Sequence, residues 1–234
     1  MGTRVLGPLL LPVIYVQARR VRRTLLVLPE PPGARAGRGY PAAGAPPGAT
    51  PGAPPLRLLV VGDSAAAGVG APSQDEALLG QLVGALAADG PLAWRLVART
   101  GATAAGTRRH LAALAPEPFD VAVTSLGLND VTAGRAPAAV LADLQAVIAL
   151  LRERFGVRHV VLSGLPRVGE FPSLPEPLRG YLGRRARALD GALAAWAGAQ
   201  PDVEHLALDV AIDPAAMASD GFHPGPAMYA AWAR

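Results

Sequence analysis

The stretch Leu58-Leu59-Val60-Val61-Gly62-Asp63-Ser64 decides the fold class of this chain. Four consecutive apolar residues are typical of a buried strand, and Gly62 allows a sharp turn directly after it. Ser64 would then stand at the carboxyl end of the strand, where α/β proteins carry their reactive groups. The same pattern fits an ordinary turn in which Ser64 caps the next helix, so the stretch alone leaves both interpretations open.

Two distant segments favour a reactive serine. Gly127-Leu128-Asn129-Asp130 follows a second apolar strand, and Asp220-Gly221-Phe222-His223-Pro224 lies near the C-terminus. With Ser64 they provide a nucleophile, a neutral amide donor and a carboxylate-imidazole pair, which are the groups of a serine acyl hydrolase. Taken singly, Asn129 could cap a turn and His223 could be a surface residue. It is their combination that predicts a site.

Strands and helices alternate along the chain from residue 57 onward. Apolar strands are expected at 57–62, 92–98, 119–126, 158–163 and 203–208. Alternation of this kind predicts parallel strands with helices on both faces. We therefore expect a three-layer α/β/α sandwich with a mainly parallel, five-stranded sheet. Ser64, Gly101 and Asn129 would all lie at its carboxyl edge.

Composition divides the chain into three segments. Residues 1–30 contain an apolar run followed by an arginine cluster, which predicts an N-terminal arm. Residues 31–55 hold eight Pro and six Gly, which is typical of a linker. Residues 56–234 are long enough for one well-packed core, so we expect a single catalytic domain there.

The apolar run from Val5 to Val16 is too short to cross a bilayer as a helix. The arginines follow it rather than precede it, which is unlike a secretory signal. The run fits either an interfacial anchor on anionic lipid or an arm that packs on the domain. We expect a cytoplasmic protein with peripheral contact at the inner face of the membrane, and secretion stays an alternative.

Residue usage excludes several other classes of protein. The chain has no cysteine, which rules out disulfides, thiolate zinc sites and a cysteine nucleophile. Its four histidines are widely spaced, so we expect no metal and no cofactor. The net charge of +4 comes from the first 56 residues, where seven Arg and one Glu give +6 and leave −2 for the rest. We therefore expect no nucleic-acid partner.

The motifs resemble those of the SGNH, or GDSL, hydrolase family. The matching blocks are Gly62-Asp63-Ser64, Gly101, the segment Gly127 to Asp130, and the segment Asp220 to His223, in the family's order over about residues 57–234. The resemblance implies the flavodoxin-like SGNH hydrolase fold and a serine esterase. Within the family, the Arg-rich arm and a Phe-Pro-rich loop resemble the bacterial esterases of long-chain N-acyl amino acid biosynthesis.

The chemistry gives each of these residues a role. A serine hydroxyl is a weak nucleophile near neutral pH, so Ser64 needs His223 as its base. Asp220 would accept the other ring N–H and hold the required tautomer. Attack creates an oxyanion, on which the backbone N–H groups of Ser64 and Gly101 and the amide of Asn129 can converge.

The predicted function is a carboxylic-ester hydrolase that forms an acyl-serine intermediate with small or lipid-like esters. A thioesterase or a lysophospholipase would use the same site. A carbohydrate O-deacetylase is less favoured, because the loops offer few aromatic or amide groups for a sugar. A non-catalytic module that binds an acylated ligand remains the alternative from another class.

Five apolar residues are candidates for the acyl pocket of such an enzyme. They are Val69, Leu128, Val131, Val168 and Phe171. Ordinary packing would account equally well for any one of them. The irregular, proline-rich stretch 164–177 is expected to set specificity and to expose Val168 and Phe171.

Overall fold

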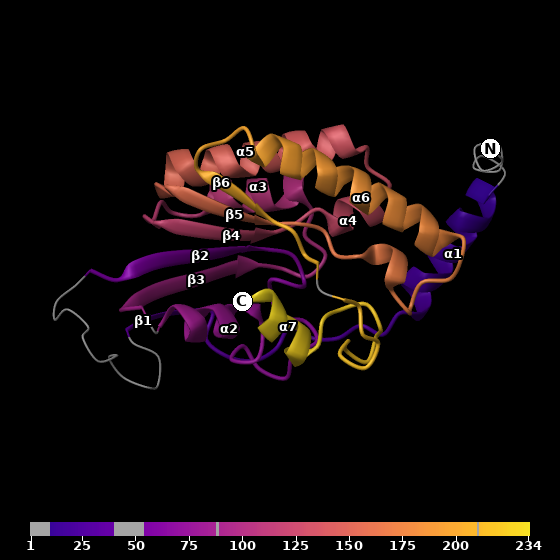
Figure 1. The fold of residues 1–234 in the computed structure, drawn as a ribbon, viewed down its shortest axis with the longest axis horizontal. Coiled ribbons are helices and arrows are strands. Elements are labelled where there is room, and N and C mark those ends of the chain that lie inside the picture. The colour runs from indigo at the N-terminus through magenta and orange to yellow at the C-terminus, as the bar shows by residue number, and fades with distance from the viewer. Residues whose placement is uncertain (1–9, 40–53, 88, 210) are drawn as a thin grey trace.

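A computed structural model describes residues 10–39, 54–87, 89–209 and 211–234 of the chain. Its centre is a six-stranded sheet with the order β1-β3-β2-β4-β5-β6 (Figure 1). The strands are β1 (Ala36–Gly39), β2 (Leu56–Gly62), β3 (Leu92–Ala98), β4 (Val121–Ser125), β5 (His159–Ser163) and β6 (Val203–Leu206). β2 to β6 run parallel, in the flavodoxin-like order 2-1-3-4-5 when counted along the chain.

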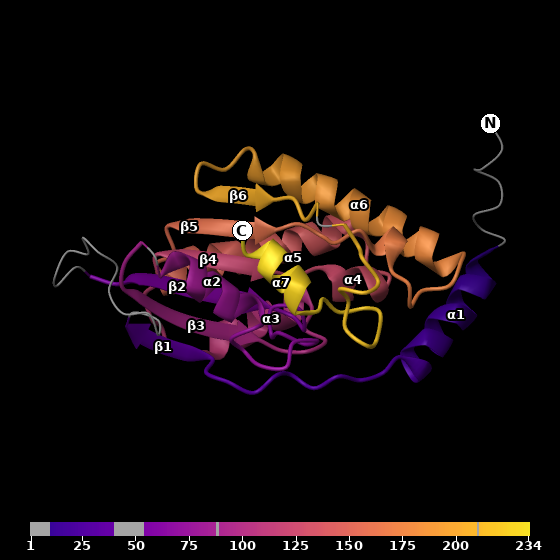
Figure 2. The same ribbon diagram turned by 60° about the horizontal axis from the view of Figure 1, so that its bottom comes forward.

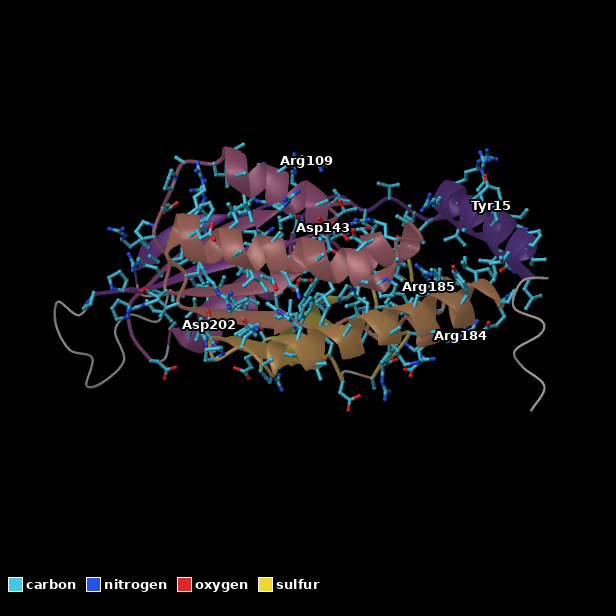
Figure 3. All side chains as sticks on the ribbon, turned by 90° about the horizontal axis from the view of Figure 1, so that it is seen from above. Tyr15, Arg109, Asp143, Arg184, Arg185 and Asp202 are labelled. Carbon is cyan, nitrogen blue, oxygen red and sulfur yellow. The ribbon has the colours of Figure 1, made fainter. Side chains whose placement is uncertain are left out.

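Helices cover both faces of the sheet (Figure 1). One layer consists of α3 (Ala104–Ala113), α5 (Pro137–Phe155) and α6 (Leu178–Ala197), and α2 (Leu78–Leu86) and α7 (Pro226–Trp232) lie on the other face. Figure 3 looks onto the first layer, with Arg109 on α3, Asp143 on α5 and Arg184 on α6. The expected three-layer sandwich with a mainly parallel sheet is confirmed.

The unbroken apolar run of β2 follows from this layering. Leu59 and Val61 pack in the cluster that contains the buried residues of α5 and α6. Leu58 and Val60 pack on the opposite face, in the cluster that contains α2 residues. A central parallel strand covered on both sides must be apolar at every position, because neither face meets water.

The antiparallel edge strand β1 lies within the segment predicted to be a linker. Its backbone pairs with β3, and the ring of Trp94 covers Gly37 so closely that a Cβ there would come within 2.2 Å of a ring carbon. The expected five strands are therefore six, and a domain boundary at residue 56 leaves out contacts made by the preceding chain. Residues 40–53 of the predicted linker lie outside the described residues.

The N-terminal arm contains α1 (Leu11–Thr24), which stands at the end of the molecule where the parallel strands terminate (Figure 2). Ile14 is buried, and the Gln17 side chain donates to the Glu176 carbonyl at 2.7 Å and accepts from the Leu178 N–H at 3.1 Å. The helix thus packs on the domain through Ile14, whereas Leu11, Val13 and Val16 of the same run are exposed, and residues 5–9 lie outside the description. No described helix is long and apolar enough to cross a membrane.

The loop 164–177 is irregular except for the single turn η2 (Val168–Glu170), but its apolar residues are not exposed. Val168 and Phe171 are only 1% and 2% exposed, so the predicted exposure is wrong. The reason is a close approach of two glycines, because a Cβ on Gly183 of α6 would lie 2.8 Å from the Gly169 Cα. Small residues on both sides let the loop close onto the helix.

Gly62 leaves no room for a side chain where β2 ends. A Cβ there would lie 2.5 Å from the Ser125 carbonyl oxygen and 2.4 Å from the Ala66 Cβ. We expect Gly62→Ala to lower the free energy of unfolding by about 1–3 kcal/mol in urea denaturation. The new methyl group requires the backbone of β2 or β4 to shift.

Gly84→Ala in α2 is the matched control for this substitution. A Cβ at Gly84 meets nothing within 4 Å, so the change should be neutral or stabilising by up to about 1 kcal/mol through helix propensity. Equal stability of the two variants would contradict the steric interpretation.

Candidate active site

The carboxyl ends of three neighbouring strands bring together residues that are far apart in the sequence. Ser64 follows β2, Gly101 follows β3, and Asn129 lies in the short helix α4 (Leu128–Thr132) after β4. His223 arrives from the loop that precedes α7. All four line one groove at this edge of the sheet.

Ser64, His223 and Asp220 form a continuous hydrogen-bonded chain. The Ser64 Oγ lies 2.9 Å from His223 Nε2, and His223 Nδ1 lies 2.5 Å from Asp220 Oδ2. The other Asp220 oxygen accepts the backbone N–H groups of Phe222 and His223 at 2.9 and 3.0 Å. The carboxylate is therefore fixed relative to the ring that it faces.

The Asp220 side chain carries its charge although it is fully buried. Burial raises the pKa of its carboxyl, but the hydrogen bonds from the His223 ring and from two backbone N–H groups outweigh burial, and the net pKa is lowered. The carboxylate accepts a hydrogen bond from the ring and thereby fixes its tautomer and orientation.

Packing also fixes the orientation of the His223 ring. The Phe222 ring meets it edge-on with centroids 5.3 Å apart, and Phe171 in turn meets Phe222 edge-on at 5.2 Å. The His223 carbonyl accepts the Ala218 N–H at 2.9 Å. The buried loop at Phe171 thus supports the imidazole through the Phe222 ring that lies between them.

Asn129 and Gly101 line the same groove as Ser64. The Asn129 amide donates to the Ala102 carbonyl at 3.0 Å and makes a longer contact of 3.4 Å with Asp63 Oδ2. Gly101 has φ +76°, a left-handed conformation that favours glycine, and a Cβ there would meet nothing within 4 Å. Its backbone therefore borders open space.

Asp130 ties the loops of the site to the first helical layer. It is completely buried, accepts the Ala104 N–H at the start of α3 at 2.9 Å, and pairs with Arg135 at 2.8 Å. These bonds fix the position of α4 relative to the start of α3. Because Asp130 directly follows Asn129, they also help to fix the position of the Asn129 amide.

Asp63 is a second buried carboxyl group at the site, and its hydrogen-bond partners are uncharged. Burial raises its pKa to about 7, against partial lowering by the Ala65 N–H and by His223, and nearby Asp130 adds to the rise. Below about pH 7 the neutral form of Asp63 predominates, and Asp220 is then the carboxylate that contacts the imidazole.

This elevated pKa makes folding stability depend on pH. Between about pH 4 and pH 7 the native protein binds more protons at Asp63 than the unfolded chain does, so stability falls as pH rises. We expect wild type to lose about 2–3 kcal/mol relative to Asp63→Asn between pH 5 and pH 8. Urea denaturation of both proteins across this range measures the difference, and parallel pH curves would contradict it.

Two hollows of very different size reach Ser64. The smaller holds about 60 Å³ and includes Leu128 and Phe171 in its lining. The larger, of about 640 Å³, includes Val131. Val69 and Val168 line neither hollow, so two of the five predicted pocket residues are placed wrongly. Both are core residues, and the Val69 carbonyl accepts the Tyr229 hydroxyl at 2.6 Å.

The sequence interpretation missed what the N-terminal segment contributes. One carboxylate oxygen of Glu30 accepts the backbone N–H and the hydroxyl of Thr100, at 2.8 and 2.9 Å, and so holds the loop that carries Gly101. Residues of α1 line the larger hollow; they are Leu11, Ile14, Tyr15, Ala18, Arg19, Val21 and Arg22. The helical spacing of Ile14, Ala18 and Val21 was a signal that could have shown an inward face.

No metal centre is evident in the part of the chain that the structure describes. Its His, Asp and Glu residues form no group of three that could hold an ion. The arrangement of nucleophile, imidazole and carboxylate needs none for acyl transfer.

The fold and this geometry define a serine hydrolase of the α/β class. The chain belongs to the GDSL-like lipase/acylhydrolase family, whose model matches residues 60–231. It is accordingly an esterase or acylhydrolase that acts on ester substrates. The comparison with curated protein sequences gives no match.

Several solved structures share the fold. The crystal structure of TesA is 28% identical, with a TM-score of 0.57, and the match covers 76% of this chain and 94% of TesA. The psychrotrophic esterase EstA from Pseudoalteromonas sp. is 17% identical with a TM-score of 0.57, covering 76% and 92%. Est24, a carbohydrate acetylesterase from Sinorhizobium meliloti, is 16% identical with a TM-score of 0.58, covering 76% and 94%.

Proposed function

We propose that this chain hydrolyses carboxylic esters of small or lipid-like acyl groups through an acyl-serine intermediate. The observation that carries the proposal is the chain of contacts from Ser64 Oγ to His223 Nε2 at 2.9 Å and from His223 Nδ1 to Asp220 at 2.5 Å. Nucleophile, base and orienting carboxylate are already in contact, as general-base activation of a serine requires.

The geometry gives the order of events. His223 Nε2 takes the proton of Ser64 as Oγ attacks the ester carbonyl carbon, and the buried Asp220 carboxylate stabilises the imidazolium. His223 then returns this proton to the leaving alkoxide, which departs as the alcohol. Water attacks the acyl-serine with His223 again as base, and the acid and free Ser64 are released.

The negative charge on the carbonyl oxygen is met by donors at the carboxyl edge of the sheet. The Asn129 amide, with the backbone N–H groups of Ser64 and Gly101, supplies the donors. The long 3.4 Å contact between Asn129 and Asp63 leaves one amide hydrogen weakly held, so it can turn to the oxyanion without losing a strong bond.

A finer placement within the family is part of the proposal. The arginine-rich arm at the site and the proline-rich loop 164–177 support the resemblance to esterases of long-chain N-acyl amino acid biosynthesis. Val13 and Val16 on α1 are 45% and 64% exposed beside the arginine cluster. This combination supports peripheral contact with an anionic lipid surface.

The first test removes the nucleophile. Ser64→Ala should abolish hydrolysis of p-nitrophenyl esters and labelling by a fluorophosphonate probe, because both need the activated hydroxyl. Ser73→Ala is the matched control. The Ser73 hydroxyl donates to the Glu76 side chain and lines neither hollow at Ser64, so its loss should leave both readouts unchanged.

Its outcomes separate the function classes. Near-normal ester turnover in Ser64→Ala would overturn the mechanism. A wild-type protein that neither labels nor hydrolyses, yet binds a fatty acid, would be the acyl-binding module. A parallel assay with acyl thioesters and lysophospholipids identifies a thioesterase or a lysophospholipase.

The second test addresses the oxyanion donors. Asn129→Ala should lower kcat by about 10²–10³ with little change in KM, because the amide stabilises charge that develops only in the transition state. Steady-state kinetics on one soluble ester give both constants. A raised KM with an intact kcat would make Asn129 a substrate-binding residue instead.

A further inference from the structure

A groove of about 640 Å³ runs from the reacting groups to α1. At one end it is lined by Ser64, Asn129 and His223, and at the other by side chains of α1. Its volume lies within the range of sites that enclose a small ligand. The groove is open to solvent on one side, so a long chain could enter it lengthwise.

The walls of the groove away from the reacting groups are mostly apolar, and Arg19 and Arg22 of α1 also line it. Ile14, Ala18 and Val21 repeat on α1 at helical spacing, and Leu178 and Leu182 of α6 also line the groove. Tyr15, which Figure 3 shows on α1, lines the groove and is held by the Arg19 guanidinium through a hydrogen bond of 3.1 Å to its hydroxyl. Such a lining suits a methylene chain rather than a sugar or a peptide.

Directed contacts keep α1 in place as a wall. Gln17 bonds with both Glu176 and Leu178, and Arg22 donates to the Thr132 carbonyl at 2.9 Å. These bonds reach the start of α6 and the end of α4, so the helix bridges the groove between two elements of the domain.

The larger groove fits the acyl half of an ester better than the smaller hollow does. Gly101 and Asn129 both line the larger groove, whereas Gly101 does not line the smaller one. A carbonyl oxygen that accepts hydrogen bonds from these two groups places its carbon beside the groove. The acyl chain and the alkoxy oxygen are both bonded to that carbon, and the larger groove has the room for a long acyl chain. The smaller hollow of about 60 Å³ holds only a few atoms.

We propose that α1 is the outer wall of the acyl site and that Ala18 on its inward face sets the length of acyl chain the enzyme accepts. The inference rests on the ester hydrolysis proposed above. An element N-terminal to the segment matched by the family model would thus determine specificity. A small side chain at this position leaves the channel between α1 and α6 open.

Chain-length profiles test this role directly. In wild type, kcat/KM for p-nitrophenyl esters should rise from acetate to decanoate, by up to about fourfold for each methylene that becomes buried. Ala18→Trp fills the groove and should reduce the decanoate-to-acetate ratio of kcat/KM at least tenfold. Leu25→Trp, which narrows the same groove from the end of α1, is a second variant that should act in the same direction.

Val27→Trp is the matched control. Val27 follows α1 in the chain, is 87% exposed and does not line the groove, so an equally large side chain there should leave the ratio unchanged. Acetate turnover that remains measurable in each variant shows that the protein is folded and catalytic.

The outcomes distinguish this inference from the proposed function. A wild type without turnover of any ester defeats the proposed function. If all three proteins turn over esters and the decanoate-to-acetate ratio of kcat/KM is the same in wild type, Ala18→Trp and Leu25→Trp, only the proposed role of α1 is wrong. Alkyl acetates of rising alcohol length form a parallel series, and selective loss of hexadecyl acetate turnover in Ala18→Trp would place the alcohol chain in the groove and overturn the assignment.

Discussion

The close approach of backbone at Gly62 is the constraint on which the site depends. Gly62 pairs with Ala98 of β3 on one side and with Ser125 of β4 on the other. These parallel strands therefore end at one level, and the chains that leave them carry Ser64, Gly101 and Asn129. β2 is also the strand at which the chain order of the sheet reverses, and such switch points are where open α/β sheets bind their ligands.

Three buried carboxyl groups near this edge of the sheet differ in their hydrogen-bond and ion-pair partners. Asp130 pairs with Arg135, Asp220 accepts three hydrogen bonds that include the His223 ring, and Asp63 has only uncharged hydrogen-bond partners and a raised pKa. Below about pH 7 Asp63 is mostly neutral, so Asp220 carries the negative charge that contacts the imidazole. For Asp63 and Asp220 the difference follows from their partners, because burial raises the pKa of both and only Asp220 has hydrogen bonds that outweigh it.

The sequence predicted which residues share the carboxyl edge of the sheet, because their placement depends on local patterns. Apolar strands and the polar residues directly after them fix which groups share an edge, whatever the details of packing. β1 could not be predicted in the same way, since Ala36–Gly39 has neither apolar alternation nor β-branched residues. Its pairing comes from the free edge of β3 and from Trp94, which covers Gly37. The burial of Val168 likewise depends on the contact of Gly169 with Gly183, which no local pattern reveals.

The N-terminal arm shows why an apolar run does not reveal its own partner. Lipid and a protein groove both select apolar residues, so the run ending at Val16 fits either environment. The position of each residue around the helix decides which face of α1 it lies on. Ile14 is buried on the inward face, whereas Val13 and Val16 are exposed on the outward face. An acyl chain in the groove would meet the inward face, and a lipid surface would meet the outward one. The two roles are therefore compatible on one helix, and a substrate drawn from a membrane would reach Ser64 along the side of α1 that faces the domain.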